Sequence, residues 1–113
     1  MIDPFLLLLA SEDLPKPELE YRFALGRKYR ADYCWPRDEL ILQNGEWSRP
    51  RWGVIVEKQG GVWQKGGHSS PLGIQRDWAK SNLAQLLGYT YLQYSPKQLL
   101  EASTIRVLKE LLR

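Results

Sequence analysis

Two acids and an amide near the middle of the chain are the residues best suited to carry chemistry. Glu57 directly follows the β-branched run at residues 54–56, and Gln59 lies two residues after Glu57. In a strand, residues i and i+2 share a face, so Glu57 and Gln59 are predicted to lie side by side while Lys58 points away. Asp32 stands within an aromatic, strand-like segment, where aspartate is disfavoured. Because such oxygen ligands suit a hard cation, we predict a Mg²⁺ or Mn²⁺ site on Asp32, Glu57 and Gln59.

Other side chains could complete or surround this site. Glu20 is a further acid that could converge on it, and the simpler interpretation of each acid is that it is solvated or paired with an arginine. His68 is the only histidine and Cys34 the only cysteine, so no zinc site is predicted. Asn82 falls in an apolar helical stripe, where a buried amide needs a hydrogen-bond partner. We interpret Asn82 either as a structural residue or as support for the site from behind the metal ligands.

The chain is mildly basic, with a net charge of +3 and an isoelectric point of about 9.1. This balance permits a polyanionic partner without requiring one. Most basic residues of the first two-thirds of the chain surround the predicted metal site: Arg22, Arg27, Lys28, Arg30, Arg37, Arg49, Arg51, Lys58 and Lys65. The segment with Arg49, Arg51 and Trp52 is typical of a nucleic-acid contact surface, or else of a solvated charged loop. His68 follows two glycines and is predicted either to contact a phosphate or base or to be a plain loop residue.

The hydrophobic pattern predicts a single α/β (α+β) domain over residues 1–113, with a central mixed β-sheet flanked by helices. Helices are expected over residues 3–12, 74–87 and 97–112. Gly88 is expected to end the second helix, and Ser95 to cap the third. Strand-like segments are expected over residues 18–23, 28–35, 39–43, 54–59 and 89–94. A hairpin turn is predicted at Asn44-Gly45, a loop or irregular strand over 46–52, and a mobile loop over 60–73.

The cellular setting is constrained by a few features of the sequence. A single cysteine inside an apolar run predicts a core thiol and favours a reducing, intracellular environment. No stretch is long enough to span a membrane. The apolar run at residues 5–10 lacks the basic flank of a signal peptide, so none is expected.

Six short motifs occur in a defined order between residues 18 and 94. They are Glu20-Tyr21-Arg22-Phe23, the octapeptide at residues 29–36 that contains Asp32, the segment 56–63 that contains Glu57 and Gln59, Gly66-Gly67-His68, Asp77 with Lys80 and Asn82, and Leu87-Gly88-Tyr89. This series resembles small phage and bacterial nucleases of the PD-(D/E)XK superfamily, with VRR-type and Holliday-junction-resolvase-like enzymes as the nearest members.

The resemblance implies a restriction-endonuclease-like core and a Mg²⁺-dependent endonuclease that acts on DNA, in particular branched or structured DNA. Asp32 and Glu57 would be the two metal-binding acids, Gln59 would occupy the place of the usual lysine, and Glu20 would complete the site. DNA contacts are expected from Arg30, Arg49, Arg51, Lys65 and His68. It also implies a homodimer, through the C-terminal helix or the apolar helix at residues 5–9, and a location in the cytoplasm of a bacterial or phage-infected cell.

The sequence departs from the family pattern in three places. Gln59 can coordinate a metal through its carbonyl but cannot act as a base, and Lys80 could stand in for the absent lysine or be a solvated helix residue. Gly67 replaces an arginine, for which Lys65 could substitute. About a dozen residues are inserted between Asp32 and Glu57. The alternatives to an enzyme are a non-catalytic DNA-binding module that retains the fold, and a structural or protein-interaction subunit.

Overall fold

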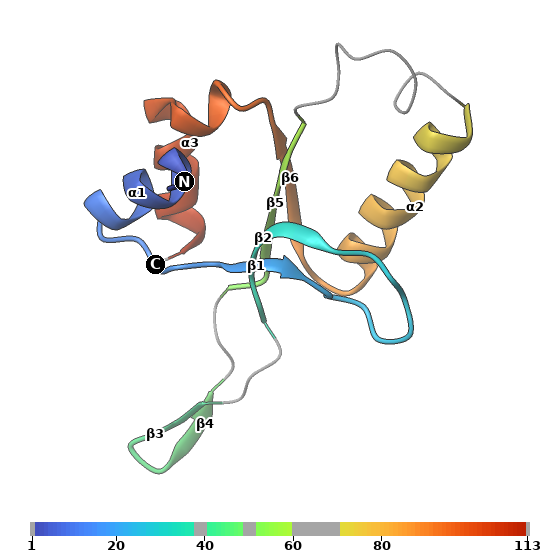
Figure 1. The fold of residues 1–113 in the computed structure, drawn as a ribbon. Coiled ribbons are helices and arrows are strands. Elements are labelled where there is room, and N and C mark those ends of the chain that lie inside the picture. Colours follow the sequence, from blue (N-terminus) through green and yellow to red (C-terminus); the bar gives the residue numbers. More distant parts are fainter. Residues whose placement is uncertain (1, 38–40, 49–51, 60–70, 113) are drawn as a thin grey trace.

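The computed structural model describes residues 2–37, 41–48, 52–59 and 71–112 (Figure 1). Its elements follow in the order α1 (Pro4–Ser11), β1 (Glu18–Tyr21), β2 (Ala31–Trp35), β3 (Ile41–Gln43), β4 (Glu46–Ser48), β5 (Val54–Lys58), α2 (Pro71–Leu86), β6 (Thr90–Tyr94), the short 3₁₀ helix η2 (Gln98–Leu100) and α3 (Ala102–Leu111). The described chain is therefore an α+β fold. None of its helices has the length and hydrophobicity of a membrane span.

The main sheet has four strands in the order β1-β2-β5-β6. Strands β1, β2 and β5 pair antiparallel in sequence, whereas β5 and β6 are parallel and are connected through α2. A parallel pair needs such a long crossover, and here the crossover includes a helix on one face of the sheet (Figure 1). The prediction of a mixed sheet flanked by helices is confirmed.

Strands β3 and β4 form a separate two-stranded sheet between β2 and β5 in the chain. The turn residues Asn44 and Gly45 have φ values of 52° and 80°, as a two-residue turn of type I′ requires. The hairpin projects away from the main sheet in Figure 1. The predicted turn is therefore confirmed.

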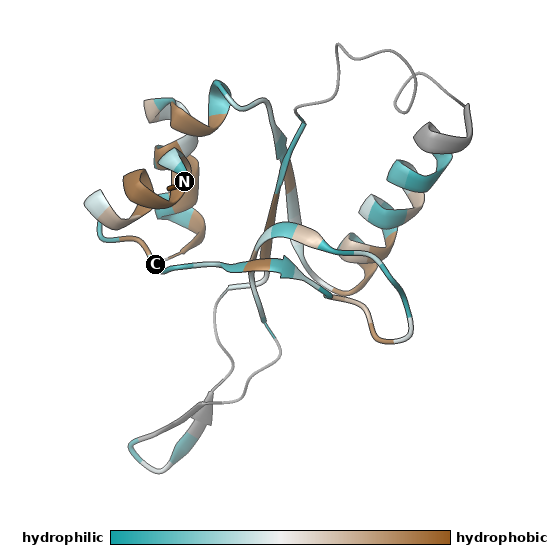
Figure 2. Ribbon diagram, viewed as in Figure 1, coloured by the Kyte–Doolittle hydropathy of each residue, from teal (hydrophilic) through white to brown (hydrophobic). Residues whose placement is uncertain are grey.

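The apolar residues of β5 alternate between two hydrophobic clusters on opposite faces of the sheet. Val54 and Val56 belong to a cluster with residues of α1 and α3, including Phe5 and Leu108. Ile55 belongs to the other cluster, with Cys34 of β2, Ala84 of α2 and Phe23 of the β1–β2 loop. Cys34 is fully buried, which confirms the predicted core thiol. The side of the sheet that carries α2 is less apolar, because α2 is mostly hydrophilic whereas α1 is largely hydrophobic (Figure 2).

Helix α2 has its last residue at Leu86 and is terminated by Gly88, the residue that the sequence predicted would end it. The Gly88 N–H donates to the Gln85 carbonyl over 2.9 Å and the Tyr89 N–H to the Ala84 carbonyl over 3.0 Å, which is the pattern of a Schellman motif. Gly88 has a φ of 89°, a conformation that favours glycine. The helix begins at Pro71, three residues earlier than expected.

The prediction of one continuous helix over residues 97–112 was wrong. Ser95 does cap its first turn, because the Ser95 Oγ accepts from the Gln98 N–H and the Gln98 Oε1 accepts from the Ser95 N–H. The chain then leaves the helical conformation at Glu101, with φ −84° and ψ 148°. The Thr104 hydroxyl donates to the Gln98 carbonyl over 2.6 Å, so a side chain holds the bend between η2 and α3.

Candidate metal site at the end of strands β2 and β5

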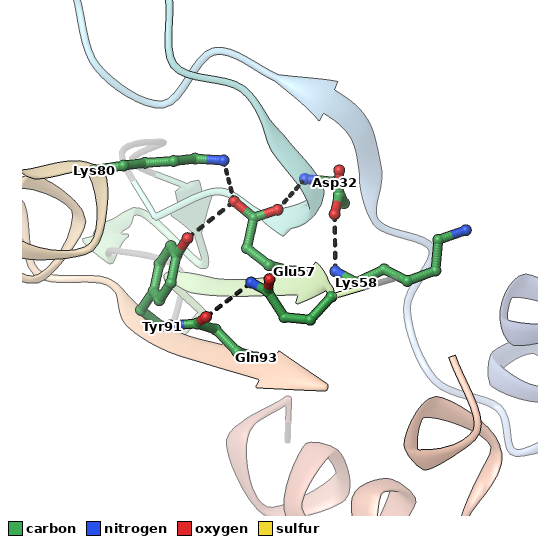
Figure 3. Close-up of polar contacts among 7 residues, drawn as sticks. Asp32, Glu57, Lys58, Lys80, Tyr91 and Gln93 are labelled. Carbon is green, nitrogen blue, oxygen red and sulfur yellow. Dashed lines mark hydrogen bonds and ion pairs between the residues drawn. The ribbon is translucent and has the colours of Figure 1, made fainter. Parts of the chain in front are cut away.

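Asp32 and Glu57 meet where the β2–β5 ladder ends. Tyr33 pairs with Val56, and the same register extended by one residue places Asp32 opposite Glu57. The Asp32 N–H donates to Glu57 Oε2 over 3.0 Å, and the Lys58 N–H donates to Asp32 Oδ2 over 2.8 Å (Figure 3). Each carboxylate thus accepts a backbone N–H of the opposite strand. Two of the three predicted metal ligands are brought together in this way.

Glu57 is the buried centre of the site, with 4% of its surface exposed. The Lys80 ammonium of α2 forms an ion pair with Glu57 Oε1, and the Tyr91 hydroxyl of β6 donates to the same oxygen over 3.1 Å (Figure 3). Burial raises the pKa of the Glu57 carboxyl, and the Lys80 ammonium and the Asp32 N–H oppose that rise. The pKa of Tyr91 is raised as well, first by burial and then by the charge of Glu57, so Tyr91 remains a neutral donor.

Gln59 lies two residues along β5 from Glu57, and its amide is engaged by β6. The Gln59 Nε2 donates to Gln93 Oε1 over 2.8 Å, and Gln93 is the register partner of Glu57 in the parallel β5–β6 pair. Because the amide nitrogen is used in this bond, the carbonyl oxygen is the atom of Gln59 that can act as a ligand. Lys58 is exposed, as the strand alternation predicted.

Tyr91 and Gln93 were missed by the sequence reasoning. They occupy positions i and i+2 of β6, and they face Glu57 and Gln59 because β6 pairs with β5 in parallel register. A Tyr-x-Gln alternation in a predicted strand is a visible signal. It gains meaning only once the partner strand and the register are known.

Glu20 and Asn82 are not brought into contact with the acids. Glu20 follows Leu19, the register partner of Tyr33, but it is exposed and has a left-handed φ of 49°. Among the described contacts, none joins Glu20 to Asp32 or Glu57. Asn82 is exposed, so the prediction of a buried amide was wrong.

The reason for the error at Asn82 is the orientation of α2. The stripe that includes Trp78, Asn82 and Leu86 faces solvent, with 63% of Trp78 and 83% of Leu86 exposed. Ala84 is fully buried instead, and Lys80, one turn before it, reaches Glu57. The helix therefore packs on the sheet through its small residue and its lysine rather than through its tryptophan.

The predicted DNA contacts are described only in part. Arg30 is exposed and immediately precedes β2, two residues before Asp32. Arg49, Arg51, Lys65 and His68 lie outside the described residues. In α1, the helix predicted as a possible dimer contact, Phe5 and Leu9 are buried in the core, whereas Leu7 is 56% exposed.

The loop between β1 and β2 is strongly basic. Residues 22–30 contain four cationic residues and no acid, and all four are exposed: Arg22, Arg27, Lys28 and Arg30. Phe23 packs the loop against the fold. The centroid of its ring lies 6.4 Å from the ring centroid of Tyr29 and 6.0 Å from that of Tyr89. Leu25, by contrast, is fully exposed, and residues 22–28 line a hollow of about 460 Å³. The loop therefore presents positive charge next to the strand that carries Asp32.

The donor set fits a magnesium-like cation better than a transition metal. Within the described part of the chain, no group of three or more His, Cys, Asp and Glu residues could hold a metal. Mg²⁺ does not need such a cage, because it is commonly bound by one or two carboxylates together with water and substrate phosphates. Asp32 and Glu57 supply the two carboxylates, and the carbonyl of Gln59 is a third oxygen of the same class.

No protein-family model, no curated protein and no solved structure matched this chain.

Proposed function

We propose that the protein is a metal-dependent endonuclease that hydrolyses phosphodiester bonds of DNA, with Asp32, Glu57 and Gln59 as ligands of Mg²⁺ or Mn²⁺. The observation that carries this proposal is the convergence of Asp32, Glu57 and Lys80 from two strands and a helix. One further acid and a lysine beside the buried Glu57 carboxylate are the charges that the resemblance to PD-(D/E)XK nucleases predicts. Lys80 supplies from α2 the positive charge that position 59 lacks.

Each residue of the site then has a distinct task. A bound cation would polarise the scissile phosphate and lower the pKa of a water molecule. Lys80 favours the ionised form of Glu57 against the effect of burial, and only that form is a good ligand for a hard cation. Tyr91 orients the Glu57 carboxylate through its hydrogen bond, and Gln93 orients the Gln59 amide.

The basic β1–β2 loop supports a polyanionic substrate. Four exposed cations without an acid among them favour the phosphate backbone of a nucleic acid, and Arg30 lies two residues from Asp32. Branched or structured DNA remains the proposed substrate. A homodimer with two such sites is proposed because a single copy of 113 residues presents little surface to DNA.

A second candidate is a DNA-binding module without catalysis. It is favoured by the hydrogen bonds themselves, because both carboxylates already accept a backbone N–H across the end of the β2–β5 ladder. In that function, Asp32 and Glu57 join the strands and bind no metal. The basic loop would still bind DNA.

Cleavage assays with isosteric variants separate these functions. Purified wild type, Asp32→Asn and Glu57→Gln are incubated with branched and linear DNA in Mg²⁺, and each is also tested for DNA binding in EDTA. We expect cleavage to fall by at least about 100-fold in both variants, because even residues behind the metal ligands commonly contribute 10- to 100-fold. DNA binding in EDTA should persist.

Asp13→Asn is the matched control. Asp13 is exposed and has a left-handed φ of 56°, which asparagine tolerates, so this variant removes a carboxylate without disturbing the fold. Variants of Asp32 and Glu57 that cleave as well as wild type would exclude the proposed catalytic site. Wild type that binds DNA without cleaving it supports the second candidate.

A further inference from the structure

A polar pocket of about 370 Å³ lies beside the candidate metal site. It is lined by Asp77, Trp78, Ser81, Asn82 and Gln93. Four of these residues come from α2 and one from β6, so the pocket is built between the helix and the edge strand of the sheet. Its volume is within the roughly 300–1,000 Å³ that is typical of small-molecule sites.

The pocket adjoins the proposed ligands through shared residues. Gln93 accepts a hydrogen bond from Gln59 and is the register partner of Glu57. Asp77 is close enough to Tyr91 for its charge to raise the pKa of that hydroxyl, and Tyr91 in turn donates to Glu57. A group in the pocket would therefore lie next to a phosphodiester held at Asp32 and Glu57.

The lining of the pocket suits a planar heteroaromatic ring rather than a phosphate. Among the residues that the structure describes, those lining the pocket include no basic side chain. Trp78 is 63% exposed, and an indole ring offers a stacking surface to any nucleobase. The Asn82 and Gln93 amides and the Ser81 hydroxyl supply donors and acceptors, which can read the edge of a base that has left its stack.

We propose that this pocket binds an unpaired nucleobase next to the phosphodiester at the metal site, with Trp78 as the stacking residue and Asn82 as an edge contact. This inference rests on the proposed function and specifies its substrate class, namely DNA with unpaired bases close to the point of cleavage. Fully paired DNA presents no free base face and would leave the pocket empty unless a base is unstacked first.

DNA binding in EDTA tests the pocket without depending on cleavage. The probes are a duplex and the same duplex with an unpaired loop that contains the fluorescent base 2-aminopurine. Wild type should bind the looped DNA more tightly and change the fluorescence of 2-aminopurine. Trp78→Ala should weaken binding of looped DNA by about tenfold, abolish the fluorescence change and leave duplex binding unaltered. Asn82→Ala should reduce the preference for the loop to a smaller extent.

Leu86→Ala is the matched control, because Leu86 is a more exposed apolar residue of the same helix face and does not line the pocket. The side chains of Trp78 and Leu86 are both largely exposed, so both variants should fold, and circular dichroism checks that they do. Equal affinity of wild type and Trp78→Ala for looped DNA would overturn the inference, as would an equal loss on both probes. If wild type shows the loop preference but never cleaves in Mg²⁺, the proposed nuclease function fails while the base-binding pocket stands.

Discussion

Removal of the Lys80 ammonium should make the stability of this protein depend steeply on pH. Lys80→Met keeps much of the aliphatic stem but leaves the buried Glu57 carboxylate without its cationic partner. A buried charge that loses its partner costs several kcal/mol, so the folded variant is expected to protonate Glu57 instead. The loss of folding free energy is then the cost of protonating Glu57 at the pH of the experiment.

The size of this effect follows from the ordinary pKa of glutamate, 4.5. In the unfolded chain Glu57 is ionised at pH 7, about 2.5 pH units above that value. Protonation on folding therefore costs at most about 3.4 kcal/mol at pH 7 and at most about 0.8 kcal/mol at pH 5, where part of the unfolded chain is already protonated at Glu57. Some of this cost already exists in wild type, because burial raises the pKa of Glu57 even with Lys80 present.

The sign follows from proton linkage. A carboxyl whose folded pKa lies above its unfolded value contributes stability that is fully present below pH 4.5 and is lost as the pH rises through the folded pKa. Because Lys80→Met raises the folded pKa further, the loss should continue at higher pH. The free energy of unfolding should fall, relative to wild type, by about 1.4 kcal/mol per pH unit between the folded pKa values of the two proteins.

Urea unfolding followed by tryptophan fluorescence in EDTA, at several values from pH 5 to pH 8, measures this dependence. Lys58→Met is the matched control, because Lys58 follows Glu57 in β5 and its side chain is exposed. This variant should change the free energy of unfolding very little at every pH. In a Glu57→Gln background, the effect of Lys80→Met should lose its pH dependence. A destabilisation by Lys80→Met that is the same at pH 5 and pH 8 would refute the coupling between Lys80 and Glu57.

Two further predictions concern the basic loop and the end of α2. Arg27→Ala/Lys28→Ala should weaken DNA binding to all sequences and reduce the slope of log affinity against log salt by about 2, and an unchanged slope would argue against phosphate contacts there. Gly88→Ala should destabilise the fold by about 1–2 kcal/mol or more in urea unfolding, because it places a Cβ on left-handed backbone at φ 89° and forces the Arg37 guanidinium to move. Gly26→Ala, at φ 77° with open space around it, is the control that isolates backbone strain, and equal losses at both glycines would exclude the clash with Arg37.

The parts of the fold that could be predicted from the sequence are those with local causes. Asn44-Gly45 and Gly88 require left-handed backbone, and both turns occur at the predicted residues. The β-branched run of β5 signals a buried strand without reference to any partner. The break at Glu101 could not be predicted in this way. It depends on the bond between the Thr104 hydroxyl and the Gln98 carbonyl, whereas the leucine pattern continues through it.

The candidate site could likewise be predicted only where the cause is local. Asp32 and Glu57 were singled out by residue type, because an acid in a strand interior or at the end of an apolar run needs a partner. Their opposite positions follow from the strand register, which the sequence alone does not reveal. Asn82 was misplaced because the apolar stripe of α2 does not indicate which side of that helix packs on the sheet. The packing of Ala84 decides that orientation.

Gln59 lacks the positive charge of the lysine that the family pattern has at its position, and Lys80 places an ammonium near Glu57 from another element. A lysine at that position would place its charge on the same strand face as Glu57. Here the Gln59 amide is tied to Gln93, and the ammonium that pairs with Glu57 comes from α2, which packs on that face of the sheet. The charge around Glu57 therefore depends on the packing of α2, so a helix that carries no predicted metal ligand supplies the ammonium that opposes the effect of burial on the Glu57 carboxyl.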